Sequence, residues 1–190
     1  MFRRLYDWAL RVSRHPHAEA YLGVVSFAES SFFPIPPDVM LAPMTLARPA
    51  RWLRLATLTT LTSVLGGAFG YAIGVFAIDL AMPLIERVGY VDAYRTAVDW
   101  FDRYGVIAVF IAGFTPIPYK VFTIASGAAA MAFVPFVLAS LVGRGARFYL
   151  VAGLVRAVGP RIEPFILRNV NLLGWLFVAL LLGGFAWFAR

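Results

Sequence analysis

Five ionisable residues stand inside long apolar stretches of this sequence, where each needs a partner or a function. Two are carboxylates, Glu29 and Asp38, and three are cations, Lys120, Arg144 and Arg147. Charged side chains within membrane segments are costly, and they usually pair with one another or line a path for ions or substrates. The set suits gating and anion binding better than bond cleavage, because the sequence has no Gly-rich phosphate loop, His-Glu zinc pattern or Ser-His pair. We expect no enzymatic activity, no metal and no cofactor.

Each of these residues has a functional and a structural interpretation. Glu29 can exchange a proton in a segment of low dielectric unless a cation pairs with it, and it can equally be an interfacial residue or the partner of an arginine. Arg144 and Arg147 are three residues apart and therefore share a helix face. Guanidinium geometry suits bidentate recognition of phosphate. The alternatives are that both arginines reach to the interface, or that they pair with Glu29 and Asp38.

Two of the five residues lie in a motif that occurs twice. The stretch 33–39 (FPIPPDV) returns as 115–121 (TPIPYKV), with the two prolines, the isoleucine and the valine at the same offsets. Proline lacks an amide hydrogen and disfavours helix at the residue before it, so both copies should break a helix. The breaking prolines are Pro34, Pro36, Pro37, Pro116 and Pro118. Asp38 and Lys120 occupy matching positions, so a direct salt bridge between them and contact with a substrate are both open.

Composition places these motifs in a membrane. The chain of 190 residues is 61% hydrophobic and 14% charged, with a mean hydropathy of +0.78, which is beyond the range of soluble domains. The net charge of +7 comes from arginines between apolar stretches, where they set membrane orientation rather than bind nucleic acid. The sequence has no cysteine, which excludes a thiol nucleophile and a cysteine-ligated metal.

The elements that position the five residues follow from the apolar stretches. We predict a single all-α polytopic membrane domain, 1–190, in which a re-entrant hairpin plus a transmembrane helix occurs twice with inverted orientation. Its parts are an amphipathic surface helix at 2–14, hairpins at 21–47 and 106–132, transmembrane helices at 55–78, 133–155 and 172–189, and an extracytoplasmic interfacial segment at 83–104. Gly66, Gly70 and Gly74 form a small-residue stripe that can pack within the chain or across a homodimer.

These stretches resemble the DedA family of SNARE-associated, or VTT-domain, membrane proteins, and specifically its YqaA-like branch. The resemblance rests on residues 27–38 (FAESSFFPIPPD), the glycines from Gly66 to Gly74, residues 113–120 (GFTPIPYK) with Gly127, and Gly143-Arg144 with Arg147-Phe148. It covers about Tyr21 to Leu150. Family members handle lipids: bacterial ones are implicated in returning the undecaprenyl phosphate carrier across the inner membrane, some with dependence on the proton-motive force, and eukaryotic relatives scramble phospholipids.

The resemblance also assigns residues. Glu29 matches the family's essential membrane glutamate and Asp38 its following acidic position. Lys120 corresponds to the basic residue after the second proline break, and Arg144 and Arg147 fall in the basic motif of the next helix. Gly113 departs from the pattern, because many members have an arginine just before the aromatic residue of this motif.

We therefore expect a multi-pass protein of the bacterial inner membrane that acts as a lipid flippase or scramblase. Its partners would be membrane lipids, one of them carrying a phosphate, and protons that release the lipid at Glu29 or Asp38. One alternative is a proton-coupled transporter of a small solute or cation, which would use the same carboxylates. Another is a non-transporting factor in membrane homeostasis or assembly, with purely structural arginines.

Overall fold

The structure is a computed structural model that describes residues 15, 17–31, 33, 35–115 and 117–159. Within these ranges every regular element is a helix. The predicted surface helix at 2–14 and transmembrane helix at 172–189 lie outside the described residues. So do Pro34 and Pro116, one proline from each copy of the repeated motif.

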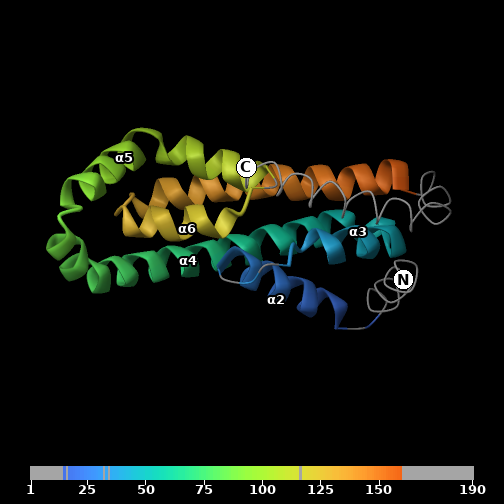
Figure 1. Ribbon diagram of the computed structural model, residues 1–190. Helices are drawn as coiled ribbons and strands as arrows, with labels where there is room; N and C mark the ends of the chain where they lie inside the picture. The colour runs from blue at the N-terminus through green and yellow to red at the C-terminus, as the bar shows by residue number, and fades with distance from the viewer. Residues whose placement is uncertain (1–14, 16, 32, 34, 116, 160–190) are drawn as a thin grey trace, which may run out of the picture.

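The helices form an elongated bundle around one long member (Figure 1). They are α2 (Ala18–Ser31), α3 (Asp38–Ala47), the 3-10 turn η1 (Pro49–Arg51), α4 (Trp52–Val88), α5 (Val91–Phe114), α6 (Tyr119–Ala128) and a last helix, Phe133–Gly159. In Figure 1, α2 and α3 lie along one half of α4, while α5 and α6 lie along the other half. Both α2 and α6 pack against α4. The segments that contain the two proline motifs therefore approach each other near the middle of the molecule.

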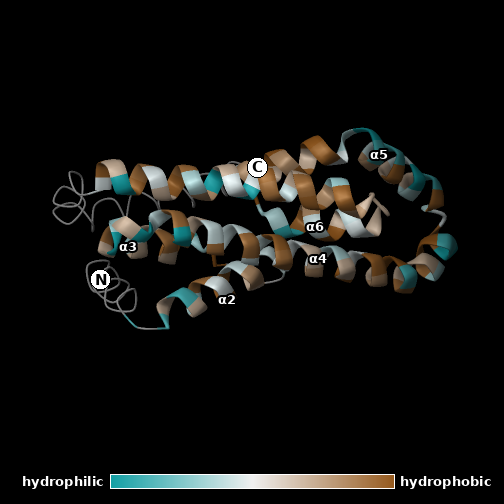
Figure 2. Cartoon of the chain, turned by 180° about the vertical axis from the view of Figure 1, so that it is seen from behind, coloured by the Kyte–Doolittle hydropathy of each residue, from teal (hydrophilic) through white to brown (hydrophobic). Residues whose placement is uncertain are grey.

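Two helices are long and apolar enough to cross a membrane, Pro49–Val88 with its initial 3-10 turn and Phe133–Gly159. The 37 residues of α4 extend about 55 Å, well beyond the roughly 30 Å of a bilayer's hydrocarbon core. The sequence predicts that this helix spans 55–78, but it continues through Asp79 to Val88 with Pro83 inside it. The segment predicted at 83–104 is accordingly divided between α4 and α5. Hydrophilic residues gather at the turn between these helices (Figure 2).

The helix α4 ends at a glycine that adopts a left-handed backbone conformation. Gly89 has a φ of 78°, in the left-handed region that glycine adopts without a steric penalty. The amide of Tyr90 donates to the carbonyl of Ile85 at 3.0 Å, which is the six-residue bond of a Schellman cap. The chain reverses here and α5 returns along the bundle.

The prolines of both copies of the motif precede a helix, and the last residues of each copy form its first turn. In the first copy α2 ends at Ser31 and α3 begins at Asp38, and in the second α5 ends at Phe114 and α6 begins at Tyr119. The first helical amides after each break need no intrahelical acceptor, so proline is tolerated immediately before α3 and α6. Each break leaves an ionisable residue, Asp38 or Lys120, in the first turn of the following helix.

The glycine stripe of α4 lies against the backbone of its neighbours. A Cβ atom at Gly66 would overlap the carbonyl oxygen of Phe27 in α2, and one at Gly74 would overlap the carbonyl oxygen of Ile124 in α6. Between them, Gly70 faces the side chain of Thr123 and the carbonyl of Ser30. The stripe thus packs against both halves of the same chain, as small residues in membrane helices allow.

Replacing Gly74 with Ala is expected to destabilise the protein by about 1–3 kcal/mol, because the added methyl group meets rigid backbone. The measurement is the free energy of unfolding in detergent micelles. Gly153→Ala is the matched control, since its Cβ would lie at an ordinary 3.5 Å from the Trp52 ring. Equal stability of the two variants, or a change of oligomeric state in Gly74→Ala, would contradict packing within the chain.

Candidate functional site

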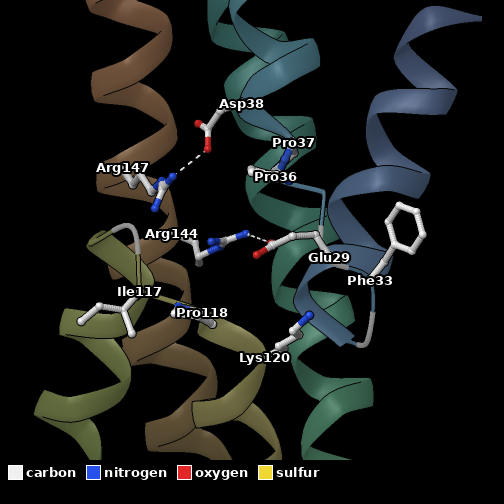
Figure 3. A pocket seen from close by; sticks show the side chains of 10 residues that line it. All are labelled: Glu29, Phe33, Pro36, Pro37, Asp38, Ile117, Pro118, Lys120, Arg144 and Arg147. Atoms are coloured by element: carbon white, nitrogen blue, oxygen red, sulfur yellow. Dashed lines mark hydrogen bonds and ion pairs between the residues drawn. The ribbon is translucent and has the colours of Figure 1, made fainter. Parts of the chain in front are cut away.

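A pocket of about 300 Å³ lies where the two proline motifs approach each other. Its lining includes the five ionisable residues singled out in the sequence, which come from α2, α3, α6 and the helix Phe133–Gly159 (Figure 3). The remaining lining residues are Phe33, Pro36, Pro37, Ile117 and Pro118. Charged residues from two parts of the sequence, 29–38 and 120–147, therefore form one site.

Glu29 and Arg144 form the most deeply buried ion pair of the described residues. The Arg144 side chain is 3% exposed and that of Glu29 is 15% exposed. The guanidinium also lies over two aromatic rings, with its carbon 4.8 Å from the Tyr119 centroid and 4.6 Å from the Phe148 centroid. Such cation–π contacts strengthen when they are desolvated. Pairing of Arg144 with Glu29 is one of the alternatives that the sequence leaves open. These contacts leave the guanidinium little room for an additional ligand.

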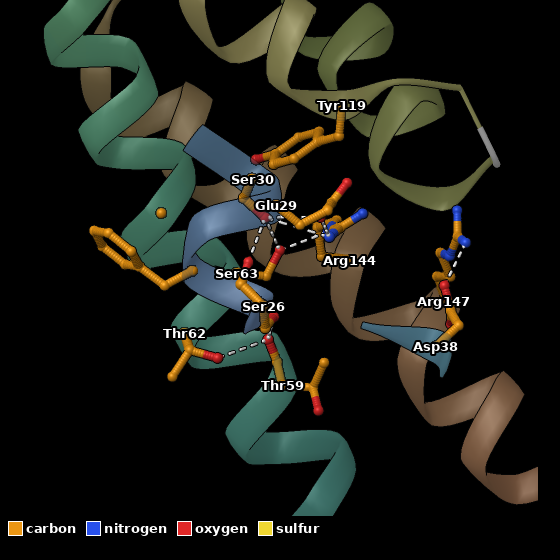
Figure 4. Close-up of polar contacts among 12 residues, drawn as sticks. Ser26, Glu29, Ser30, Asp38, Thr59, Thr62, Ser63, Tyr119, Arg144 and Arg147 are labelled. Carbon is orange, nitrogen blue, oxygen red and sulfur yellow. Dashed lines mark hydrogen bonds and ion pairs between the residues drawn. The ribbon is translucent and has the colours of Figure 1, made fainter. Parts of the chain in front are cut away.

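Serine hydroxyls complete the surroundings of this pair (Figure 4). Arg144 Nε donates to Ser63 Oγ at 2.6 Å, and Ser63 Oγ is 2.7 Å from Ser30 Oγ. Ser30 Oγ also donates to Glu29 Oε2 at 3.2 Å. The ion pair thus lies beside a row of hydroxyl groups between α2 and α4. Ser26 extends this row, because its hydroxyl donates to the carbonyl of Thr59.

Replacing Ser63 with Ala is expected to cost about 1–3 kcal/mol of stability, because it leaves the buried Arg144 Nε–H without an acceptor. The free energy of unfolding measures this loss. Thr62→Ala is the control, since the Thr62 hydroxyl bonds only to carbonyls of its own helix, and we expect a change within about 0.5 kcal/mol. A Ser63→Ala variant as stable as the control would show that Arg144 does not depend on this hydroxyl.

Arg147 connects the two breaks. One terminal nitrogen donates to Asp38 Oδ2 at 2.7 Å, and the other donates to the carbonyl of Thr115 at 2.6 Å. Asp38 opens the helix after the first break, while Thr115 follows the helix before the second. The second carboxylate oxygen, Asp38 Oδ1, is buried and has no hydrogen-bond partner among the residues that the structure describes. A single guanidinium therefore holds both breaks together and leaves one acceptor free.

Lys120 lies on the α6 side of the same pocket (Figure 3). The sequence leaves open a direct salt bridge between Lys120 and Asp38, but Asp38 pairs with Arg147 instead. No ion pair involves Lys120 within the described part of the chain. The pairing differs because Arg147 is on the helix face that meets both breaks, which the spacing of the motifs alone does not reveal. Of the three pocket cations, Lys120 is the one whose charge is not matched by a carboxylate.

Comparison with known proteins places this arrangement in a family. The sequence profile of the VTT domain matches residues 35–157. The chain belongs to the VTT-domain family. This is the domain of the DedA, or SNARE-associated, membrane proteins. The matched residues of the VTT domain contain Asp38, Lys120, Arg144 and Arg147, whereas Glu29 precedes them.

Two bacterial relatives are similar to this chain over nearly its full length. An uncharacterized protein of Haemophilus influenzae is 44% identical over 180 residues, which cover 95% of this chain and 94% of the relative. An uncharacterized protein of Histophilus somni is 40% identical over 175 residues, 92% of each chain. No solved structure matches. Family membership and the apolar helices indicate a membrane protein with a role in membrane transport or homeostasis, in a family whose members are generally not enzymes.

Three uncharged residues that contact Arg144 are not among the candidate site residues predicted from the sequence. They are the two rings that enclose Arg144, Tyr119 and Phe148, and the hydroxyl of Ser63. A signal for Phe148 exists, because it follows Arg144 by four positions and so shares its helix face. Ser63 belongs to a pattern too: Ser26 and Ser30 contact Thr59 and Ser63, and both pairs are separated by 33 residues.

Proposed function

We propose that the protein moves a phosphate-bearing lipid across the bacterial cytoplasmic membrane, as a flippase or scramblase. The lipid headgroup occupies the charged pocket between the two proline motifs. The observation that carries this proposal is the charge of that pocket, where three cations meet two carboxylates and leave Lys120 in excess. An anionic headgroup neutralises this excess.

Arg147 and Asp38 supply the two-state element that transport needs. Arg147 is partly exposed to the pocket, with 18% of its side chain accessible, and guanidinium groups bind phosphate oxygens in pairs. A phosphate beside Lys120 competes with Asp38 for Arg147. Protonation of Asp38 frees Arg147 for the phosphate, so in this proposal the lipid is released when Asp38 loses its proton, the reverse of the order expected from the sequence. Loss of the Arg147 contacts frees the two breaks from each other. The ligand thus shifts a conformational equilibrium through its preference for one state.

The arrangement of the helices supports a hairpin-based mechanism. Two antiparallel helix pairs, α2–α3 and α5–α6, lie in opposite halves of the bundle and direct their breaks toward the same pocket (Figure 1). In our proposal the two pairs are re-entrant hairpins that enter from opposite faces of an inverted repeat. Ser63, next to the pocket, follows Arg54 by nine positions, or about 13 Å of helix. A pocket at that depth is near the middle of a bilayer if the arginines before and at the start of α4, Arg48, Arg51 and Arg54, mark the cytoplasmic interface.

The test is a lipid translocation assay with the purified protein in vesicles, run over several headgroups with and without a pH gradient. We expect movement of phosphate-bearing lipids and a change of rate when the side facing Asp38 is acidified. The proposal fails if wild-type protein moves no lipid. It also fails if Glu29→Gln and Arg144→Ala leave headgroup translocation unchanged while both variants remain folded.

The same vesicles discriminate the solute-transport alternative. A proton-coupled transporter of a small solute would show proton flux that depends on the solute, without movement of lipid. The family-level role in homeostasis without transport would show neither signal.

A further inference from the structure

An apolar groove of about 400 Å³ runs along the outer face of α5 beside α6. Its main lining residues are Trp100, Tyr104, Ile107, Ile111, Ile117 and Phe122. The α5 residues follow each other at intervals of three or four positions and therefore share one helix face. Three of them, Trp100, Tyr104 and Ile107, are between 46% and 57% exposed. The groove is thus a hydrophobic surface that is open to the surroundings of the protein.

This groove begins where the charged pocket ends. Ile117, the central residue of the second proline motif, lines both cavities. On one side of Ile117 are Lys120 and Arg147, and on the other are only apolar and aromatic side chains. A charged pocket that continues into an apolar groove matches an amphiphile with an anionic end and a hydrocarbon end.

The dimensions of the groove match one leaflet of a membrane. From Ile111 to Trp100 the helix extends roughly 17 Å, close to half of the ~30 Å hydrocarbon core. The outer end carries Trp100 and Tyr104, the residue types that concentrate at the membrane–water interface. Asp99, Asp102 and Arg103 flank these aromatics, as expected where the chain meets water. The groove therefore extends from the mid-depth pocket to the interface on the side of the α4–α5 turn.

We propose that this groove holds one hydrocarbon chain of the lipid whose phosphate occupies the charged pocket. The inference rests on the proposed function and deepens it, because it assigns the chain a binding site on the protein rather than leaving it in bulk lipid. A headgroup at mid-depth with its chain along α5 describes a lipid part-way through translocation, still anchored in the leaflet on the side of the α4–α5 turn. The substrate class is a lipid phosphate with at least one chain long enough to follow α5.

Fluorescence quenching tests the site directly, and the absence of native cysteine allows single labels without background. A fluorophore is attached to Cys in Ile107→Cys, in the groove, and in Val106→Cys, which is 48% exposed on the same helix but outside the lining. Each labelled protein is placed in phosphatidylcholine vesicles that contain a minor fraction of chain-brominated phosphatidic acid or chain-brominated phosphatidylcholine.

We expect the label at position 107 to respond to the brominated phosphatidic acid with an apparent association about tenfold tighter than to the brominated phosphatidylcholine. Lys120→Gln should remove that preference, and the label at position 106 should show none. Equal preference at both positions would mean ordinary lipid contact and would overturn the proposal. Absence of quenching at 107 by either lipid would also overturn it, because another part of the chain or a second copy would then cover the groove.

A second arm measures translocation. Ala108 also lines the groove, so Ala108→Trp fills it, whereas Val106→Trp adds the same ring outside the lining. We expect the first variant to slow translocation of a long-chain lipid phosphate about tenfold and the second to stay within about twofold. If both variants match the wild type, the groove assignment is wrong while the proposed function stands. If the wild type moves no lipid, the proposed function fails, and the quenching result still decides whether the groove binds a chain.

Discussion

Translocation of a phosphate-bearing lipid is expected to fall about 10- to 100-fold in Lys120→Gln. Hydrogen bonds to charged groups contribute about 1.5–3 kcal/mol, and every 1.4 kcal/mol is a factor of ten. Lys120 is the pocket cation that no described carboxylate neutralises, so its removal leaves the pocket without excess positive charge. Initial rates in vesicles, measured at several lipid concentrations, give the result.

Two controls separate this effect from damage to the fold. Lys120→Arg keeps the charge and should retain most of the activity. The melting temperature of Lys120→Gln should equal that of the wild type, because both ion pairs of the pocket remain intact. A fully active Lys120→Gln variant would exclude Lys120 from headgroup binding. The charges of the pocket would then have only a structural role.

The second large effect is expected for stability. Replacing Arg144 with Ala should cost about 3–5 kcal/mol of unfolding free energy, the range observed when one member of a buried ion pair is removed. The loss is large because Glu29 keeps a charge without a partner, while Ser63, Tyr119 and Phe148 lose the group that they surround. Denaturant titration in micelles measures the cost.

A cation elsewhere on the same helix provides the comparison. Arg156 is exposed and stacks on Trp52 at 5.4 Å, so Arg156→Ala should cost less than about 1 kcal/mol. The double variant Glu29→Gln/Arg144→Gln removes both charges and should recover part of the stability lost in Arg144→Ala. If Arg144→Ala is as stable as Arg156→Ala, the Glu29–Arg144 pair does not hold the site together.

The sequence predicts which ionisable residues form the site, but not which of them pair with one another. Costly charges inside apolar segments mark all five ionisable residues, and the structure brings these five into one pocket. The repeated prolines mark the positions where α2 and α5 end. Both signals are local, since a charge in an apolar stretch and a missing amide hydrogen can each be seen without knowledge of the fold.

Features that depend on the relative rotation and length of helices are not predictable in this way. The sequence leaves Asp38 open to pair with Lys120 or with one of the two arginines, and the face that the last described helix presents to the breaks selects Arg147. The extension of α4 from Asp79 to Val88 is missed because Asp79 ends the uncharged run and Pro83 lies inside the extension, although most of its residues are apolar. The contact of Tyr119 with Arg144 joins two helices, so no spacing in the sequence distinguishes this ring from the other tyrosines.

The long sequence separation of the ion-pair partners has a consequence for synthesis. Glu29 precedes Arg144 by 115 residues and Asp38 precedes Arg147 by 109. At 5–20 residues per second, the glutamate leaves the ribosome roughly 6–23 s before its partner. During that interval the first half of the protein carries carboxylates whose cations do not yet exist. Membrane insertion therefore has to tolerate an incomplete intermediate in which Glu29 and Asp38 are either protonated or still in contact with water, and the last described helix completes the site when it arrives.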